Sequence, residues 1–121
     1  MAHKVYVQRV YGRRAATGGL RVLVDRLWPR GLSRSTADLD DWCKEIAPST
    51  ELRRWYGHAP ARWSEFEQRY RAELTDEPHV RAVEHLRQLT LHQDLTLLTA
   101  THDIETSHAV VVMRYLTGEV V

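Results

Sequence analysis

The sequence predicts a small α/β domain with a short, mostly parallel sheet of three strands flanked by about five helices. The periodic segments follow the order strand, strand, four helices, strand, helix. The long helical crossover between the second and third strands favours parallel pairing. A length of 121 residues, of which 43% are hydrophobic, fits a single domain over residues 1–121 with one modest core.

The two N-terminal strands are predicted from different patterns. Residues 4–11 alternate between two faces, as in a strand with one face buried. Residues 12–19 are polar and contain a Gly–Gly pair, which predicts a mobile loop. Residues 21–25 carry a continuous apolar run, which predicts a second strand buried on both faces, and residues 27–34 form the next loop.

The first predicted helix begins at Ser35 and stops before Pro48. Ser35 can cap the free amides of the first turn, and apolar residues recur at helical spacing on one face. That face consists of Leu39, Trp42, Cys43 and Ile46. Cys43 is the only cysteine, and on such a face we expect it to be a core residue rather than a nucleophile.

Three more helices are predicted before the third strand. Ser49 caps a short one, a second runs from Pro60 to Leu74, and Pro78 opens a third. Their inward faces consist of Leu52 and Trp55, then Trp63, Phe66, Tyr70 and Leu74, then Val80, Val83 and Leu86. The histidines expected at the surface are His79, His85 and His92.

The last two predicted elements are a strand over residues 94–100 and a helix from about Glu105 to Gly118. Polar side chains cluster where the second strand and this third strand end. The clusters consist of Asp25, Arg26, Trp28 and Arg30, and of His102, Asp103 and His108. If the two strands are parallel neighbours, both clusters lie at the carboxyl edge of the sheet, where ligands bind in open α/β folds.

These residue types predict a site for a small anionic ligand. Arg26 and Arg30 could clamp a carboxylate or a phosphate through paired donors, and Trp28 could form a wall. His58, in a connection between helices, could close over the site, and His102 completes the predicted ligand-binding set. The amides that precede the last helix could also receive an anion.

The same clusters could perform acid/base chemistry of the hydrolase or transferase type. Asp25 could act as a general base if its pKa is raised, and Asp103 and His108 are the other candidate catalytic groups. A structural network in which Asp25 pairs with Arg26 and ties the loops together explains these residues equally well. The sequence therefore leaves open whether the protein is an enzyme.

Two non-catalytic alternatives are a regulatory protein that binds metal or one that binds nucleic acid. Suitable metal ligands are His58, His102, Asp103 and His108. Their spacing matches no metal-binding motif, so we expect no metal or other cofactor. Arginines interleave with Trp55, but a net charge of +1 argues against nucleic acid as the partner. The chain has no apolar run long enough for a membrane span and no signal peptide, which predicts a cytoplasmic protein.

Five segments carry a family pattern. They are VLVDRLWPRG from Val22, APSTELRRW from Ala47, RYRAEL from Arg69, LTLLTATHD from Leu95 and HAVVV from His108. Together they resemble the small bacterial YeaO-like proteins of a domain-of-unknown-function family. That family has no established activity, so the resemblance implies membership and no reaction. Its members usually have Lys or Arg at the position of His102, which implies an anion-facing position and makes Asp103 and His108 the better candidates.

Overall fold

Four parallel strands form the centre of the computed structural model, which describes residues 3–12 and 19–118. The strands are β1 (Val5–Arg9), β2 (Leu20–Leu23), β3 (Asp41–Trp42) and β4 (Leu95–Thr99), in the spatial order β1-β4-β2-β3. Each neighbouring pair is parallel, as the helical crossover predicted. Of the loop predicted over residues 12–19, residues 13–18 lie outside the described residues.

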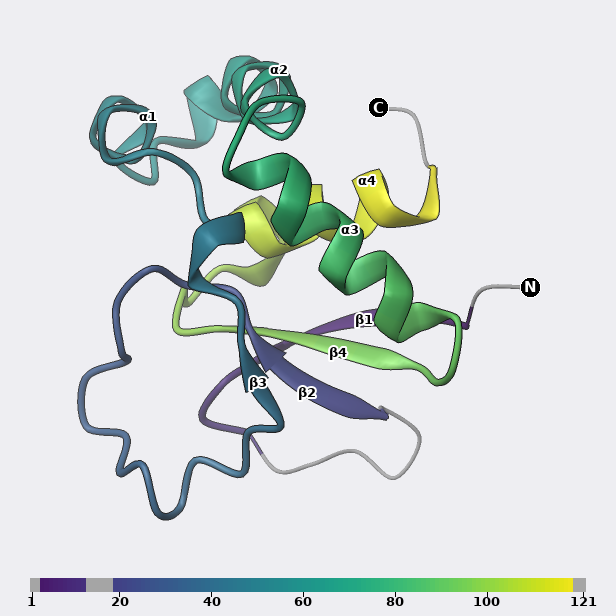
Figure 1. Ribbon diagram of the computed structural model, residues 1–121. Coiled ribbons are helices and arrows are strands. Elements are labelled where there is room, and N and C mark those ends of the chain that lie inside the picture. Colours follow the sequence, from purple (N-terminus) through teal and green to yellow (C-terminus); the bar gives the residue numbers. More distant parts are fainter. Residues whose placement is uncertain (1–2, 13–18, 119–121) are drawn as a thin grey trace.

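Helices cover one face of this sheet (Figure 1). The α-helices are α1 (Thr50–Tyr56), α2 (Trp63–Glu73), α3 (His79–Thr90) and α4 (His108–Thr117), with 3-10 turns at η1 (Lys44–Ile46), η2 (Pro60–Arg62) and η3 (Ile104–Thr106). Two predicted helix ends are confirmed: Ser49 caps α1 by accepting the amide of Leu52 at 3.1 Å, and Gly118, at a φ of 77°, ends α4. Within the described ranges, no helix combines the length and the apolar composition that crossing a membrane requires.

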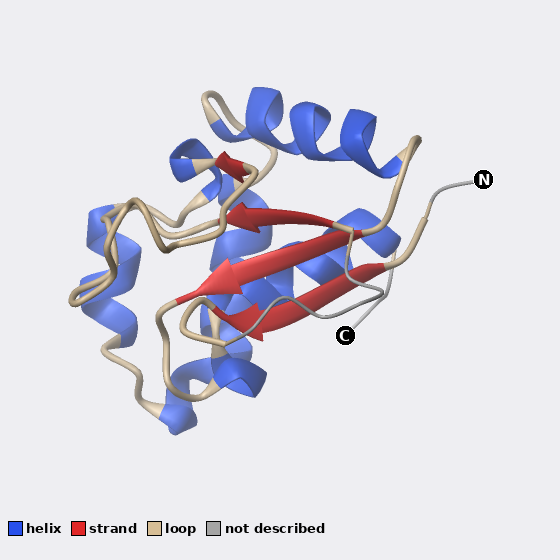
Figure 2. Ribbon diagram, turned by 90° about the horizontal axis from the view of Figure 1, so that it is seen from below, coloured by secondary structure: helices blue, strands red, loops and turns tan. Residues whose placement is uncertain are grey.

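The two faces of the sheet are covered differently. Helices pack over the main core, which includes Val22, Val24, Leu95 and Leu97 of the sheet region and Phe66, Tyr70, Leu86 and Val111 of the helices. A smaller apolar cluster forms on the other face, and it includes residues of the loop between β2 and β3. In Figure 2, this loop lies beside the carboxyl ends of the strands. That cluster consists of Val10, Leu23 and Leu98, with Trp28, Leu32, Leu39, Trp42 and Ala100 packed against them.

The helix predicted from Ser35 to Pro48 is wrong. Residues 41–42 form the edge strand β3 beside β2, and only the 3-10 turn η1 follows. The apolar residues of the predicted face serve two separate cores: Leu39 and Trp42 pack in the smaller cluster, whereas Cys43 and Ile46 are buried under the helices. Because a strand sends neighbouring side chains to opposite faces, burial on both sides of the sheet produced a spacing that resembles a helix. The fold therefore has four strands instead of three, and four α-helices in its described part instead of about five.

The start of α3 brings a second correction. His79, predicted at the surface, is only 7% exposed, and its Nε2 lies 2.8 Å from the carbonyl oxygen of Ala47. Because a carbonyl oxygen only accepts, Nε2 must donate in this contact. Val80, predicted to face inward, is exposed instead. His79 can take the inward position that hydrophobicity alone assigns to its neighbour, because the carbonyl of Ala47 satisfies its buried ring nitrogen.

Replacing His79 with alanine is expected to lower the free energy of unfolding by about 1–2 kcal/mol, the cost of a buried hydrogen bond. The loss stays moderate because the carbonyl of Ala47 also accepts from Nη2 of Arg26 at 3.1 Å. Urea unfolding measures the change. The matched control is His92→Ala, an exposed histidine just after α3, for which we expect a change within about 0.5 kcal/mol. Equal losses in the two variants would show that the buried contact is not what stabilises this region.

Candidate functional site

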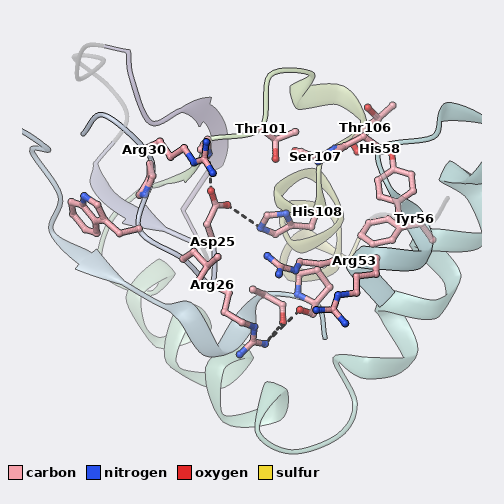
Figure 3. Close-up of a pocket in the computed structure, with 18 residues that line it drawn as sticks. Asp25, Arg26, Arg30, Arg53, Tyr56, His58, Thr101, Thr106, Ser107 and His108 are labelled. Atoms are coloured by element: carbon pink, nitrogen blue, oxygen red, sulfur yellow. Dashed lines mark hydrogen bonds and ion pairs between the residues drawn. The ribbon is translucent and has the colours of Figure 1, made fainter. Parts of the chain in front are cut away.

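A pocket of about 620 Å³ opens at the carboxyl edge of the sheet, where β2 and β4 end beside each other (Figure 3). Its walls come from the loop after β2, from α1 and the segments that flank it, and from the connection between β4 and α4. The lining residues are Asp25, Arg26, Leu27, Trp28, Pro29 and Arg30; Ala47, Pro48, Arg53, Arg54, Tyr56, His58 and Phe66; and Ala100, Thr101, Thr106, Ser107 and His108. The volume is in the usual range for a site that holds a small molecule.

The structure brings six of the eight predicted site residues to this pocket. They are Asp25, Arg26, Trp28, Arg30, His58 and His108. The other two, His102 and Asp103, lie outside it with side chains that are 85% and 81% exposed and whose Nδ1 and Oδ1 atoms are 3.2 Å apart. They are turned outward because the chain makes the turn η3 between the end of β4 and the start of α4.

Asp25 and His108 form a largely buried pair in the pocket. Nε2 of His108 lies 3.2 Å from Oδ1 of Asp25 and 3.0 Å from the carbonyl oxygen of Val24. The side chain of His108 is 12% exposed and that of Asp25 is 15% exposed. Both neighbours of Nε2 are acceptors, so Nε2 must carry a hydrogen. Oδ2 of Asp25 accepts the backbone amide of Ala100 at 2.8 Å. The pair therefore joins the ends of β2 and β4 to the first residue of α4.

The pKa of Asp25 is shifted in a direction that affects which chemistry this carboxylate can perform. Burial raises this pKa, but the hydrogen bond and the charge of His108, together with the contacts to Ala100 and Thr99, outweigh burial and lower it from the ordinary value of 3.8. A carboxylate with a lowered pKa stays ionised at neutral pH and is a weak proton acceptor. This direction is the opposite of what a general base needs.

The structural-network hypothesis required Arg26 to pair with Asp25, but the two side chains make no ion pair. Its Nη2 donates to the carbonyl oxygens of Ala47, at 3.1 Å, and of Pro48, at 3.5 Å (Figure 3). Arg26 thus ties the loop after β2 to the segment that precedes α1. Its role in the pocket wall is to hold these two segments together.

Trp28 anchors the loop after β2 on the sheet. Its Nε1 donates to the carbonyl of Leu32 at 2.7 Å, and its ring packs edge-to-face on Trp42 with centroids 5.4 Å apart. The guanidinium of Arg34 lies 4.4 Å from the centroid of the Trp28 ring. The part of Trp28 that lines the pocket is therefore held rigidly.

Two lining arginines, Arg53 and Arg54, were not among the predicted site residues. Both lie on α1, and their signal in the sequence was the RR pair inside the family segment APSTELRRW. Among the described residues, the side chains of Arg30, Arg53 and Arg54 make no hydrogen bond or ion pair. The described residues that line the pocket thus include four arginines and one carboxylate, Asp25, and this excess of arginines favours a positive potential.

Neither a metal cluster nor a reactive thiol is found near these groups. In residues 3–12 and 19–118, no three or more His, Cys, Asp or Glu side chains gather in a way that could hold a metal ion. Cys43 is buried in the main core, as predicted, and does not line the pocket. Burial and the nearby charges of Asp41 and Glu45 raise the pKa of its thiol to about 12.

Comparison with known proteins places the chain in a family. Residues 4–121 match a family model described as the inactive DUF488-N3 subclade. An uncharacterized protein of Mycobacterium tuberculosis is 44% identical over 115 residues, which cover 95% of each chain. The uncharacterized protein YeaO of Escherichia coli is 38% identical over 112 residues, which cover 93% of this chain and 96% of YeaO. No solved structure matches the chain. The chain therefore belongs to the inactive DUF488-N3 subclade and is a YeaO-like protein, as its sequence segments indicated.

Proposed function

We propose that this protein binds a small anionic ligand in the pocket at the carboxyl edge of its sheet, without transforming it. One observation carries the proposal: Arg30, Arg53 and Arg54 line the pocket, and their guanidinium groups have no partner among the described residues. Unpaired guanidiniums in a concave site attract anions, and their paired donors fit the oxygens of carboxylate or phosphate groups.

Binding is favoured over catalysis by the state of the groups in the pocket. The pKa of Asp25 is lowered, which makes it a weak base, and the hydroxyl of Ser107 already donates to the carbonyl of Ile104 at 2.6 Å. The thiol of Cys43 lies outside the pocket. The description of the matching subclade as inactive agrees with a binding role. The acid/base chemistry of the hydrolase or transferase type that the sequence also allowed is therefore not part of this proposal.

Binding of metal or of nucleic acid stays the alternative to this proposal, and a cytoplasmic location stays a prediction. The aromatic and basic residues behind the nucleic-acid alternative contact one another in the structure. The guanidiniums of Arg62 and Arg69 lie 5.3 Å and 4.3 Å from the centroid of the Trp55 ring. A base that stacked on Trp55 would have to displace them, so we favour a small anion over nucleic acid.

Inorganic phosphate is the probe that tests the proposal. Removing two charges from the pocket in the double variant Arg53→Gln, Arg54→Gln is expected to weaken phosphate binding at least about tenfold. The matched control, Arg69→Gln with Arg81→Gln, removes the same charge from residues that do not line the pocket, and should stay within about twofold of the unmodified protein. Isothermal titration calorimetry at low, constant ionic strength measures the affinities.

Two results would overturn the proposal. One is the absence of phosphate binding by the unmodified protein at millimolar concentrations. The other is an equal loss of affinity in the two double variants, because that would indicate a general effect of net charge. Thermal unfolding of each variant separates a local loss of binding from a loss of folding.

A further inference from the structure

The lining arginines approach the pocket from two sides. Arg30 belongs to the loop after β2, whose Trp28 packs in the smaller apolar cluster of the sheet. Arg53 belongs to α1, whose Leu52 and Tyr56 are buried in the helix-covered core. These segments therefore reach the sheet edge from opposite faces. In Figure 3, the pair formed by Asp25 and His108 lies between Arg30 and Arg53.

One compact anion does not account for this arrangement. Arg53 and Arg54 both line the pocket from α1, and a single guanidinium already offers the paired donors that bind one phosphate or carboxylate group. Arg30 would then remain without a counter-charge on the other side of the pocket. A second anionic group on the same ligand would pair with it, and a pocket of about 620 Å³ has room for an extended molecule.

The group between the arginines selects against a third anion. Asp25 lines the pocket between the arginines with a side chain that is 15% exposed, and it is the one carboxylate among the described lining residues. An ionised carboxylate in this position repels another anion and can accept a hydrogen bond from a hydroxyl or amino group of a ligand. The middle of a bound ligand should therefore be uncharged and should carry such donors.

We infer that the pocket binds a bis-anion: a small molecule with an anionic group at each end and hydroxyl groups between them, such as a sugar phosphorylated at both ends. The inference rests on the proposed function and adds the class of ligand. The end held by α1 contacts Arg53 and Arg54, the other end contacts Arg30, and the hydroxyl groups face Asp25.

Three probes test this inference by calorimetry at constant ionic strength: fructose monophosphate, fructose bisphosphate and hexanediol bisphosphate, which has two phosphates and no hydroxyl between them. The unmodified protein is expected to bind fructose bisphosphate at least about tenfold tighter than either other probe. Arg30→Gln should reduce the preference for bisphosphate over monophosphate to about twofold, with little change in monophosphate affinity. Arg81→Gln, an exposed arginine on α3 outside the pocket, is the matched control and should keep the full preference.

The outcomes separate the inference from the proposed function. Equal affinity for fructose monophosphate and fructose bisphosphate would overturn the bis-anion and leave anion binding intact. Equal affinity for the two bisphosphates would overturn the role of Asp25 in reading hydroxyl groups. A loss of preference in Arg81→Gln as large as in Arg30→Gln would show long-range attraction and would also overturn the inference. If none of the probes binds, nor inorganic phosphate, the proposed function itself fails.

Discussion

Replacing Phe66 with alanine is expected to lower the free energy of unfolding by about 3–5 kcal/mol, because the change empties a large volume in the core. Phe66 is 1% exposed, and its ring stacks on Tyr56 with centroids 4.2 Å apart and an angle of 17° between the planes. Tyr70 and Trp63 pack beside it, with centroids at 5.7 Å and 5.9 Å. Such a loss removes much of the stability of a typical domain. Urea unfolding with a fluorescence readout measures it.

The control for this prediction is Leu91→Ala, which removes an exposed apolar side chain just after α3. We expect its free energy of unfolding to stay within about 0.5 kcal/mol of the unmodified protein. A Phe66→Ala variant that unfolds at the same urea concentration as Leu91→Ala would mean that the aromatic stack under the pocket contributes nothing to stability.

Replacing Asp25 with asparagine is expected to change stability and anion binding in opposite directions. The variant keeps an oxygen that can accept the amide of Ala100 but loses the charge that faces His108, which should cost about 2 kcal/mol of stability. It also removes the one carboxylate among the described lining residues, so phosphate should bind at least about fivefold tighter. Urea unfolding and phosphate titration measure the two effects.

The effect of Asp25→Asn on stability is expected to depend on pH in one direction. The pKa of Asp25 is lower in the folded protein than its ordinary value of 3.8, so the ionised group stabilises the fold above that value. This contribution is lost as the pH falls through the lowered folded-state pKa. The stability difference between the unmodified protein and Asp25→Asn should therefore shrink as the pH falls below 3.8. Asp103→Asn, at an exposed position, should show neither effect, and weaker phosphate binding by Asp25→Asn would contradict the account of the pocket.

Local patterns in the sequence were sufficient for most of the fold and for six of the eighteen described residues that line the pocket. The apolar runs of β2 and β4 and the helical crossover between them predicted parallel strands, because only a long connection can return the chain in the same direction. Polar residues directly after β2 predicted where a site would lie, and Asp25 and Arg30 do line the pocket. The cap at Ser49 was also readable, since it depends on neighbours within one turn.

Contacts between segments distant in the chain decide which side chains are buried, and local sequence patterns did not predict these contacts. The segment from Leu39 to Ile46 has helical spacing, yet it forms β3 and η1 because its apolar side chains have cores on both faces of the sheet to fill. His79 can be buried because its Nε2 donates to the carbonyl of Ala47, more than thirty residues earlier in the chain.

The composition of the pocket was likewise decided by tertiary structure. Arg53 and Arg54 reach it because α1 packs against the helix layer beside the ends of β2 and β4, whereas the turn η3 moves Asp103 out of it. The sequence determined which strand ends carry polar groups, since side chains follow the strand directly. Which of those groups meet, and which arginines remain unpaired around them, depends on how segments distant in the chain pack together.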